Sequence, residues 1–594
     1  MNIGLRSISV LAALGATLVA LALTPRVAAA AWPLSGRAIA TTPGGQVHPA
    51  ITSDGHDGAI ICWQDGRLRF GNIFAQHVLA SGELDPAWPV NGRGLLTDTL
   101  ALAGSDGGQI SPVIVGDGAG GAIVAWLDNR DAATETDIFA QHVLASGDVD
   151  PNWKSDGTPV LAFTGLQNSL VIASDGAGGA ILAWKDARPG STDGDIFAQH
   201  VLASGQVDLR WPEDGLPVCV APGRQDSPVI VSDGAAGAII AWNDARNGTT
   251  GVDVFAHHVL ERGVVDRAWP VNGRGVCTAP GDQAVGSIVG DGGSAPGNVA
   301  GAIIAWTDGR VVGTSHIFAQ HVSGSGVVDP VWPVNGRLVS GAASIEGRPL
   351  ATPDGAGGAV VTWEAVVVNT NMFAQHVSAA GIVDPRWPAG GRALSVTASN
   401  QTHADIVADG SGGAIVAWED NADLFAQHVL AAGVLDPSYP ANGLAISNLP
   451  SGEGDVALVA TSGIGAIAAW SDTRNLGRTA PDIFAMQVQA VPATADAPPP
   501  APLRIAFDHP RPDPAQGSLE LRYVLPSTMR ARLTILDVGG RRVLELASGE
   551  QSAGAHAIRW DLRDSRGQRV AAGLYFARFE AGERVLTQKF TAVR

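Results

Sequence analysis

The sequence predicts an all-β protein, with an eight-bladed β-propeller of about 58-residue repeats followed by a small β-sandwich. Three observations support this prediction. One pattern recurs eight times between residues 32 and 490, each copy holds four short apolar runs rich in β-branched residues, and no copy shows helical periodicity. The 75 glycines lack a Gly-X-Y period, so they indicate turns and exclude a collagen-like chain. Helical solenoids are excluded as well.

Three aromatic markers define the repeat. A tryptophan ends the "AIIAW" run at Trp63, Trp126, Trp184, Trp242, Trp306, Trp363, Trp418 and Trp470. A phenylalanine in "DIFAQHV" follows at Phe74, Phe139, Phe197, Phe255, Phe318, Phe373, Phe425 and Phe484. A second tryptophan, in "DPxWPxxG", stands at Trp32, Trp88, Trp153, Trp211, Trp269, Trp332 and Trp387, with Tyr439 in the last place.

The intervals between markers separate scaffold from variable loop. The phenylalanine precedes the next "WP" aromatic by 14 residues in every case, so this segment tolerates no insertion. The interval from the "AIIAW" tryptophan to the phenylalanine varies from 7 to 14 residues. Variation of this kind is typical of an exposed loop on a fixed scaffold.

The copy beginning at Ser227 shows the expected strands. We expect strand a at 228–232, strand b at 237–242, strand c at 253–259 and strand d after "WPVNG", with glycines supplying the a–b turn. The pattern begins with a lone strand d, Trp32 to Ala40, and ends after a strand c near Ala490. The first strand is therefore expected to complete the last blade and close the ring. A seven-bladed ring and a parallel stack of repeats remain alternatives.

The regions outside the repeats differ from the repeats in composition. Residues 1–30 read as a signal peptide, with Arg6, an apolar run and Ala28-Ala29-Ala30, although an uncleaved anchor is an alternative. Residues 31–490 are the propeller, and the Pro/Ala-rich residues 491–503 are a linker. Residues 504–594 are expected to form a small β-sandwich. The net charge is about +5 over residues 501–594 and about −24 before them, within a total of −19.

The last segment carries a family resemblance. Leu525-Pro526, "ILDVGGRRV", "RWDLRD", "GLYFARF" and the terminal "KFTAVR" occur in the order found in C-terminal type IX secretion sorting domains. The same segment is similar to the immunoglobulin-like domain of the flagellar hook-capping protein. The resemblance implies a bacterial protein that crosses the outer membrane and is secreted or displayed on the cell surface, with residues 504–594 contacting the secretion machinery. The family's "NPFNP"-like opening is replaced by residues 510–514.

Composition and motifs exclude several functions. Clustered Lys and Arg are absent from the acidic repeat, which argues against nucleic acid, and three Cys cannot form a disulfide framework. Seven "AQH"-type histidines, from His77 to His428, are spread one per blade, so we expect no metal and no cofactor. The sequence lacks a G-x-S-x-G, P-loop or sialidase Asp-box motif. We therefore expect that the protein is not an enzyme.

The variable b–c loops are the expected ligand face. They span residues 128 to 137, 186 to 195, 244 to 253, 308 to 316 and 472 to 482. Their candidate residues come from a W-x-D-x-R motif, in which the charged pair serves either as a structural ladder or as a ligand-binding rim: Asp128, Arg130, Asp186, Arg188, Asp244, Arg246, Asp308, Arg310, Asp472 and Arg474. We expect a monomeric recognition or scaffold protein that binds a glycan or protein; an extracellular glycan-active hydrolase and a surface-layer building block are alternatives.

Overall fold

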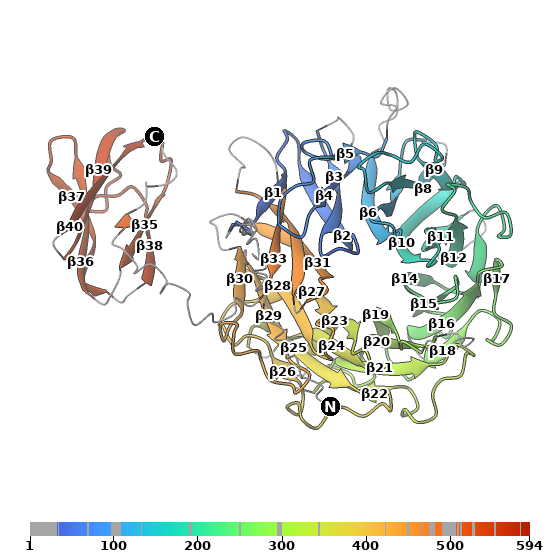
Figure 1. Cartoon of the computed structure of the whole chain (residues 1–594). Coiled ribbons are helices and arrows are strands. Elements are labelled where there is room, and N and C mark those ends of the chain that lie inside the picture. The colour runs from blue at the N-terminus through green and yellow to red at the C-terminus, as the bar shows by residue number, and fades with distance from the viewer. Residues whose placement is uncertain are drawn as a thin grey trace, which may run out of the picture. The chain divides into compact units, whose positions relative to one another are not determined.

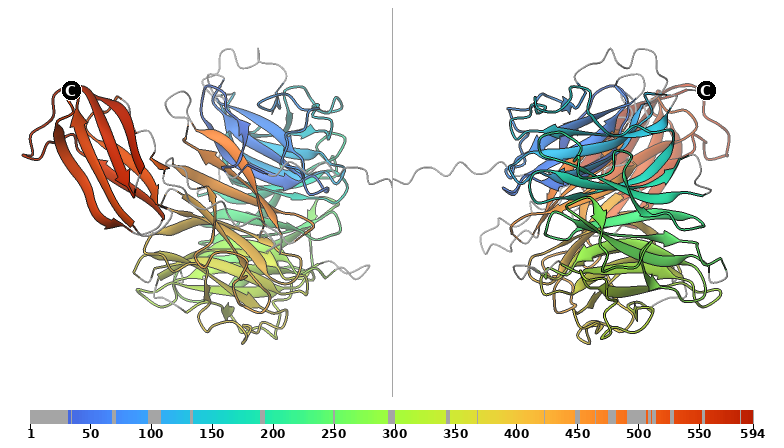
Figure 2. Two further views of the ribbon diagram at one scale, coloured as in Figure 1. Left: turned by 60° about the vertical axis from the view of Figure 1, so that its left-hand side comes forward. Right: turned by 90° about the vertical axis from the view of Figure 1, so that its right-hand side faces the viewer.

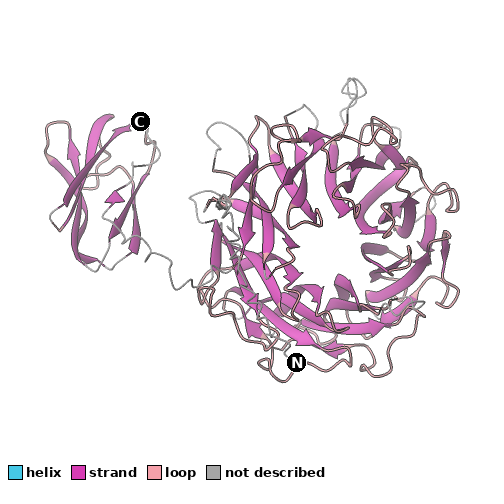
Figure 3. Cartoon of the chain, in the orientation of Figure 1, coloured by secondary structure: helices cyan, strands magenta, loops and turns pink. Residues whose placement is uncertain are grey.

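The structure, a computed structural model, divides into two compact units, Met1–Ala490 and Val491–Arg594. It describes residues 32–593, except 34, 68–70, 97–107, 132–133, 189–192, 249–250, 294–299, 342–344, 367, 422, 448–451, 464, 475–480, 490–505, 508–509, 511–513, 526–528, 552–553 and 583. The expected signal peptide and linker lie outside the described residues. The described part is built from strands and contains no helix (Figure 3).

Eight blades of four antiparallel strands surround the axis of the first unit (Figure 1). Blades 1 and 2 contain β2 (Gln46–Ser53), β3 (Ala59–Asp65), β4 (Asn72–Val78), β5 (Arg93–Gly94), β6 (Gln109–Gly116), β7 (Ala122–Asp128), β8 (Glu135–Val143) and β9 (Thr158–Leu161). Blades 3 and 4 contain β10 (Gly165–Ser174), β11 (Ala180–Ala187), β12 (Asp195–Val201), β13 (Leu216–Cys219), β14 (Gln225–Ser232), β15 (Ala238–Asp244), β16 (Asp253–Leu260) and β18 (Arg274–Cys277), with the short β17 (Val264–Val265) also on β16.

The second half of the ring repeats this order. Blades 5 and 6 contain β19 (Gln283–Gly290), β20 (Ala302–Asp308), β21 (His316–Val322), β22 (Arg337–Leu338), β23 (Ile345–Pro353), β24 (Ala359–Val366), β25 (Thr370–Val377) and β26 (Arg392–Ala393). Blades 7 and 8 contain β27 (Gln401–Ala408), β28 (Ala414–Asp420), β29 (Asp423–Val429), β30 (Leu444–Ser447), β31 (Glu453–Ala460), β32 (Ala466–Asp472), β33 (Asp482–Val488) and β1 (Arg37–Ala40). Figure 2 shows the ring from two further directions.

The N-terminal strand closes the ring. Strand β1 pairs antiparallel with β33, with Arg37 opposite Ala485 and Ala38 opposite Phe484, and so completes blade 8. A second contact crosses the same junction, because the Ser462 hydroxyl donates to Asp57 Oδ2 at 2.7 Å. The eight-bladed ring and its closure by a lone strand d, both expected from the phase of the repeat, are confirmed.

The core lies between successive blades. Strand b of each blade is buried on both faces, and its tryptophan is fully buried in all eight blades. Residues of adjacent strands b pack together, as Ile181 of blade 3 does with Ile240 and Trp242 of blade 4. A strand buried on both faces has no polar side to alternate with, which explains the continuous apolar runs in the sequence.

The "WP" tryptophans join each blade to the next. Trp88 of blade 1 donates its indole N–H to the carbonyl of Ala145, in the c–d turn of blade 2, at 3.2 Å. A Cβ atom on Gly147 of that turn would lie 2.7 Å from the Trp88 ring. Since each 14-residue interval carries both a turn that receives one tryptophan and the tryptophan that docks on the next turn, an insertion would misplace one of them.

The second unit is a two-sheet sandwich, as expected from its alternating runs. One sheet contains β34 (Ala506–Phe507), β35 (Leu519–Leu525) and β38 (Gly554–Trp560); the other contains β37 (Arg542–Gln551), β36 (Met529–Asp537), β39 (Gly573–Ala581) and β40 (Arg584–Ala592). Its core includes Tyr523, Trp560, Phe579 and Phe590. Among the described residues, no helix has the length and apolar character needed to cross a membrane.

Candidate functional site

The W-x-D-x-R residues form a clasp inside each blade. In blade 5, Asp308 accepts the Trp306 indole N–H at 2.8 Å and the Arg310 Nε–H at 2.7 Å. The Arg310 guanidinium lies 3.9 Å from the Phe318 ring centroid and donates to the Asn335 carbonyl in the turn before strand d. Burial raises the pKa of Asp308, but hydrogen bonds from Arg310 and Trp306 outweigh it and leave the pKa below its usual value.

The same clasp recurs at the other candidate pairs. The carboxylates of Asp128, Asp186, Asp244 and Asp472 are fully buried, and each contacts the arginine two residues later. The ten candidates belong to five blades, and the structure does not gather them into one concave site. The guanidinium groups stay partly exposed, with 14–26% of their side-chain surface accessible. A role in ligand binding remains a prediction, and 132–133, 189–192, 249–250 and 475–480 of the expected loops lie outside the described residues.

A bulge near the start of strand a, the innermost strand, exposes one residue in most blades. The register shifts there, as between Val47 and Ala50 of β2. A residue inside the shift has a positive φ, between 50° and 57°, in seven blades: His48, Ser111, Ser169, Ser227, Arg348, His403 and Asp455. A bulge with positive φ turns the side chain out of the strand's alternation. All seven side chains are exposed.

This ring of bulge residues is asymmetric. Blades 2 to 4 carry serine, whereas blades 6, 7, 8 and 1 carry Arg348, His403, Asp455 and His48. Two acidic residues of strand b, Glu364 and Glu419, contact Arg348 and His403. Each of them directly follows the tryptophan of its strand. We call the six residues the charged half-ring: His48, Arg348, Glu364, His403, Glu419 and Asp455.

Direct contacts link the charged half-ring across four blades. Arg348 Nη1 lies 3.4 Å from Glu364 Oε1, which accepts the His403 backbone N–H at 3.0 Å. His403 Nδ1 lies 3.0 Å from Glu419 Oε2, and Glu419 Oε1 accepts the Asp455 backbone N–H at 3.0 Å. Asp455 Oδ2 lies 3.4 Å from His48 Nδ1. These contacts hold charged groups of both signs at one edge of the channel.

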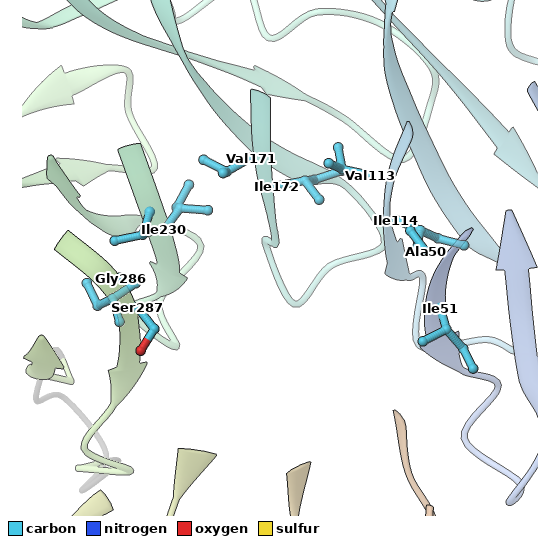
Figure 4. Close-up of a pocket in the computed structure, with 11 residues that line it drawn as sticks. Ala50, Ile51, Val113, Ile114, Val171, Ile172, Ile230, Gly286 and Ser287 are labelled. Atoms are coloured by element: carbon cyan, nitrogen blue, oxygen red, sulfur yellow. The ribbon is translucent and has the colours of Figure 1, made fainter. Parts of the chain in front are cut away.

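Cavities lie beside and behind the charged half-ring. One of about 430 Å³ is lined by Arg348, Glu364, His403 and Asp455, with Gly286 of blade 5 at its edge. The channel itself holds a space of about 390 Å³ between strands a of blades 1 to 5, with apolar walls that include Ile51, Ile114, Ile172 and Ile230 (Figure 4). A charged mouth over an apolar channel can hold a ligand that is polar at one end or along one face.

One partly buried acidic residue follows the charged half-ring along strand a. Asp405 occupies the register of Ala50 and Val113, which line the channel. Its carboxylate accepts the backbone N–H groups of Leu458 at 2.7 Å and Ile406 at 2.8 Å. Burial raises the pKa of Asp405 to about 6, against the opposing effect of these two hydrogen bonds. This carboxyl therefore changes its charge near neutral pH.

Sequence reasoning missed the charged half-ring. The repeat looks symmetric in the sequence, and its acids in variable segments are those of the b–c loops. A signal existed in the aligned copies, because one residue near the start of strand a changes from Ser to His, Arg or Asp while the residue that follows it stays apolar. The bulge could not be foreseen, because strict alternation would place this residue on one face of the blade. Within the described residues, no group of His, Cys, Asp or Glu is arranged to hold a metal ion.

Comparison with known proteins assigns the C-terminal unit. Residues 513–583 match the family model of the FlgD Ig-like domain, the immunoglobulin-like domain expected from the resemblance. This match covers a small part of the chain and leaves the propeller unassigned. No curated protein matches the sequence.

Several solved structures are similar to the chain. An α-L-arabinanase from Penicillium chrysogenum, complexed with arabinobiose, shows 12% identity and a TM-score of 0.30, covering 53% of this chain and 90% of its own. The Hadza microbial sialidase Hz136 shows 13% identity and a TM-score of 0.31, covering 62% and 76%. Prolyl oligopeptidase B from Galerina marginata shows 10% identity and a TM-score of 0.39, covering 74% and 56%.

These comparisons correct one expectation. The prediction that the protein is not an enzyme is contradicted, because the similar solved structures include an arabinanase and a sialidase. The absence of a known motif does not separate this chain from such proteins. At these identities and TM-scores, the likeness assigns neither an activity nor a catalytic residue to this chain.

Proposed function

We propose that the protein is exported to the cell surface or the medium and binds a glycan at the mouth of its propeller. The observation that carries this proposal is the charged half-ring, where the repeat loses its symmetry. Binding sites are found where specific polar groups stand on a rigid scaffold beside a cavity. The charged half-ring combines both features.

The chemistry of the mouth suits a polyhydroxylated ligand. Carboxylates of Glu364, Glu419 and Asp455 accept hydrogen bonds from hydroxyl groups, and Arg348 and His403 can donate them. The side chains of Arg348, His403 and Asp455 are 61%, 54% and 45% exposed, so their outer surfaces remain free to contact a ligand. The partly exposed arginines of the clasps would form an outer rim on the same b–c face.

The C-terminal unit supports export in this proposal. The match to an immunoglobulin-like domain fits the resemblance of residues 504–594 to type IX sorting domains. We propose that this unit engages the secretion machinery. In the producing bacterium, deletion of residues 504–594 should leave the propeller in the periplasm. Normal surface display or release of the truncated chain would contradict this part.

A hydrolase acting on glycans is the second candidate. Glu364 accepts the His403 backbone N–H and Glu419 contacts His403 Nδ1, so two carboxylates from adjacent blades flank one residue at the cavity. Glycoside hydrolysis uses two carboxylates on either side of the scissile bond. The two carboxylates have different side-chain partners, Arg348 for Glu364 and His403 for Glu419.

A matched set of variants tests binding at the mouth. We would measure binding of the purified protein to a panel of polysaccharides for Arg348→Asn, His403→Asn and the control Ser169→Asn. All three positions have a φ between 50° and 54°, which Asn tolerates, so the backbone should persist. We expect about 10-fold or greater loss for the first two, from lost charge-assisted hydrogen bonds, and little change for the control. Equal effects in all three variants would overturn the proposed site.

The two candidate functions differ in one further measurement. Glu364→Gln and Glu419→Gln keep the side-chain shape but remove the charge. If the protein is a hydrolase, turnover of a polysaccharide should be lost in one or both variants while binding persists. If it is a recognition protein, no turnover should be found in the unchanged protein, and binding should weaken in both variants.

A further inference from the structure

Seven blades contain a histidine between two aspartates; it is buried in five of them and partly buried in blades 5 and 6. The histidine lies on strand c, one aspartate begins the a–b turn, and the other follows the c–d turn. In each blade both ring nitrogens lie 2.8 to 3.1 Å from a carboxylate oxygen. The seven sets are Asp54–His77–Asp85, Asp117–His142–Asp150, Asp175–His200–Asp208, Asp233–His258–Asp266, Asp291–His321–Asp329, Asp354–His376–Asp384 and Asp409–His428–Asp436.

Blade 4 shows why the ring needs two protons. His258 is fully buried, with Nε2 at 2.8 Å from Asp233 Oδ2 and Nδ1 at 3.0 Å from Asp266 Oδ2. Both carboxylates are ionised near neutral pH: burial raises the pKa of each, but hydrogen bonds from His258 and from backbone N–H groups outweigh it and lower the pKa. An ionised carboxylate has no proton to donate, and neutral imidazole has a single N–H. Only imidazolium satisfies both contacts.

We propose that these seven histidines are held as imidazolium ions between paired carboxylates, and that the seven sets form a pH-sensitive lock on the ring. Each set ties three segments of a blade: the a–b turn, strand c and the loop before the "WP" aromatic. The histidine also packs against that aromatic, with 5.9 Å between the His77 and Trp88 ring centroids. Because Trp88 docks on the next blade, each lock also supports a joint between blades.

Several sets have further titratable or charged neighbours. In blade 1, the His56 backbone N–H donates to Asp54 Oδ1 at 2.7 Å. In blade 4, a further titratable neighbour is His257, whose Nδ1 accepts the His258 backbone N–H at 2.9 Å. Burial, together with the positive charge on His258, lowers the pKa of His257 to about 4. In blades 3 and 6, Arg210 and Arg386 contact the outer carboxylates of Asp208 and Asp384. Strand c of blade 4 therefore holds a charged and a neutral buried histidine side by side.

Acid and base should both open the lock. Protonation of a carboxylate removes its negative charge, and loss of one ring proton leaves a nitrogen lone pair facing a carboxylate. Blade 8 offers a comparison within the chain, because Thr461 and Gln487 replace the turn aspartate and the histidine. Its a–b turn is joined to blade 1 by the Ser462–Asp57 contact instead.

Nitrogen NMR of the folded chain, labelled at histidine, tests the protonation state directly. At neutral pH, we expect both ring nitrogens of His258 to be protonated and His257 to keep one unprotonated nitrogen. The variants His258→Gln and His257→Gln assign the two sets of signals. An unprotonated ring nitrogen on His258 at neutral pH would overturn the proposal.

A stability series tests the lock. His258→Gln gives blade 4 the side chain of blade 8, and the control His257→Gln restores the glutamine found at Gln199 and Gln320. We expect His258→Gln to lower the unfolding temperature at neutral pH and the control to change it little. The difference between His258→Gln and the unchanged protein should shrink in acid, where the carboxylates become protonated. A difference that is constant with pH would show a purely steric effect and contradict the lock.

Discussion

Single residues decide where the propeller departs from its repeat. His403 and Ser169 occupy the same bulge with nearly the same φ, 50° and 54°, yet one belongs to the charged half-ring and the other does not. The backbone is thus common to seven of the eight blades, while one exposed side chain in each of these is free to vary. A substitution at this position changes the mouth of the channel at little cost to the fold, because the side chain is exposed.

Asp405 is the residue for which we expect a gain in stability on substitution. Its pKa of about 6 lies above the usual value of 3.8. A carboxyl with a raised pKa favours folding at low pH, and this contribution is lost as the pH rises through about 6. Asp405→Asn can keep the hydrogen bond from Leu458 without a negative charge. We expect it to raise the free energy of unfolding at pH 7.5 by about 1–3 kcal/mol.

Denaturant unfolding at pH 4 and pH 7.5 measures this effect. Near pH 4 the carboxyl is largely protonated in the folded state, so the variant and the unchanged protein should have nearly equal stability. Equal gains at both pH values would show that the pKa of Asp405 is not raised. Glu419→Gln, a partly buried acid of the same blade, serves as the control for removal of a negative charge.

At the scale of secondary-structure elements, the c–d turn controls the joint between blades. Gly147 has a φ of 82° and a Cβ there would lie 2.7 Å from the Trp88 ring. Gly118, in the a–b turn of the same blade, has a φ of 77° and open space around it. Both Gly147→Ala and Gly118→Ala strain the backbone by about 1 kcal/mol. We expect Gly147→Ala to cost about 1–3 kcal/mol more, because the turn must move away from Trp88.

Thermal unfolding of the two alanine variants separates backbone strain from the steric contact. A larger loss for Gly147→Ala, accompanied by a change in Trp fluorescence, would support the joint. Similar losses for both variants would mean that the joint between blades tolerates a methyl group, and that the fixed 14-residue interval has another cause.

Elements were more predictable than the site because they are repeated. Eight copies of one pattern average out local ambiguity, so the strands, the turns and the fixed 14-residue interval could be predicted from the sequence. The W-x-D-x-R pairs were conspicuous because they also recur. In the structure, their Asp and Arg side chains contact the Trp, the Phe and the turn before strand d of the same blade. The charged half-ring is formed where the copies differ, and its contacts cross four blades, from Arg348 to His48. Such contacts depend on ring closure and on a bulge, neither of which shows in a single copy.

At the scale of the whole molecule, the closure at blade 8 determines whether the ring is one cooperative unit. Strand β1 covers the edge of β33, and without it the backbone groups of that edge would be unpaired. The charged half-ring crosses the same junction through Asp455 and His48. Opening the ring would therefore weaken both the fold and the candidate site.

A deletion of residues 32–40 tests this dependence. We expect the shortened chain to unfold at a lower temperature and to form dimers or aggregates, because the exposed edge of β33 is a template for pairing with another chain. Adding a synthetic peptide of residues 32–43 should restore the monomer, since the peptide can occupy the vacant edge by strand addition. A scrambled peptide of the same composition is the control. If the shortened chain stayed monomeric with unchanged stability, the N-terminal strand would not be the closing element, and the site at the mouth would not depend on it.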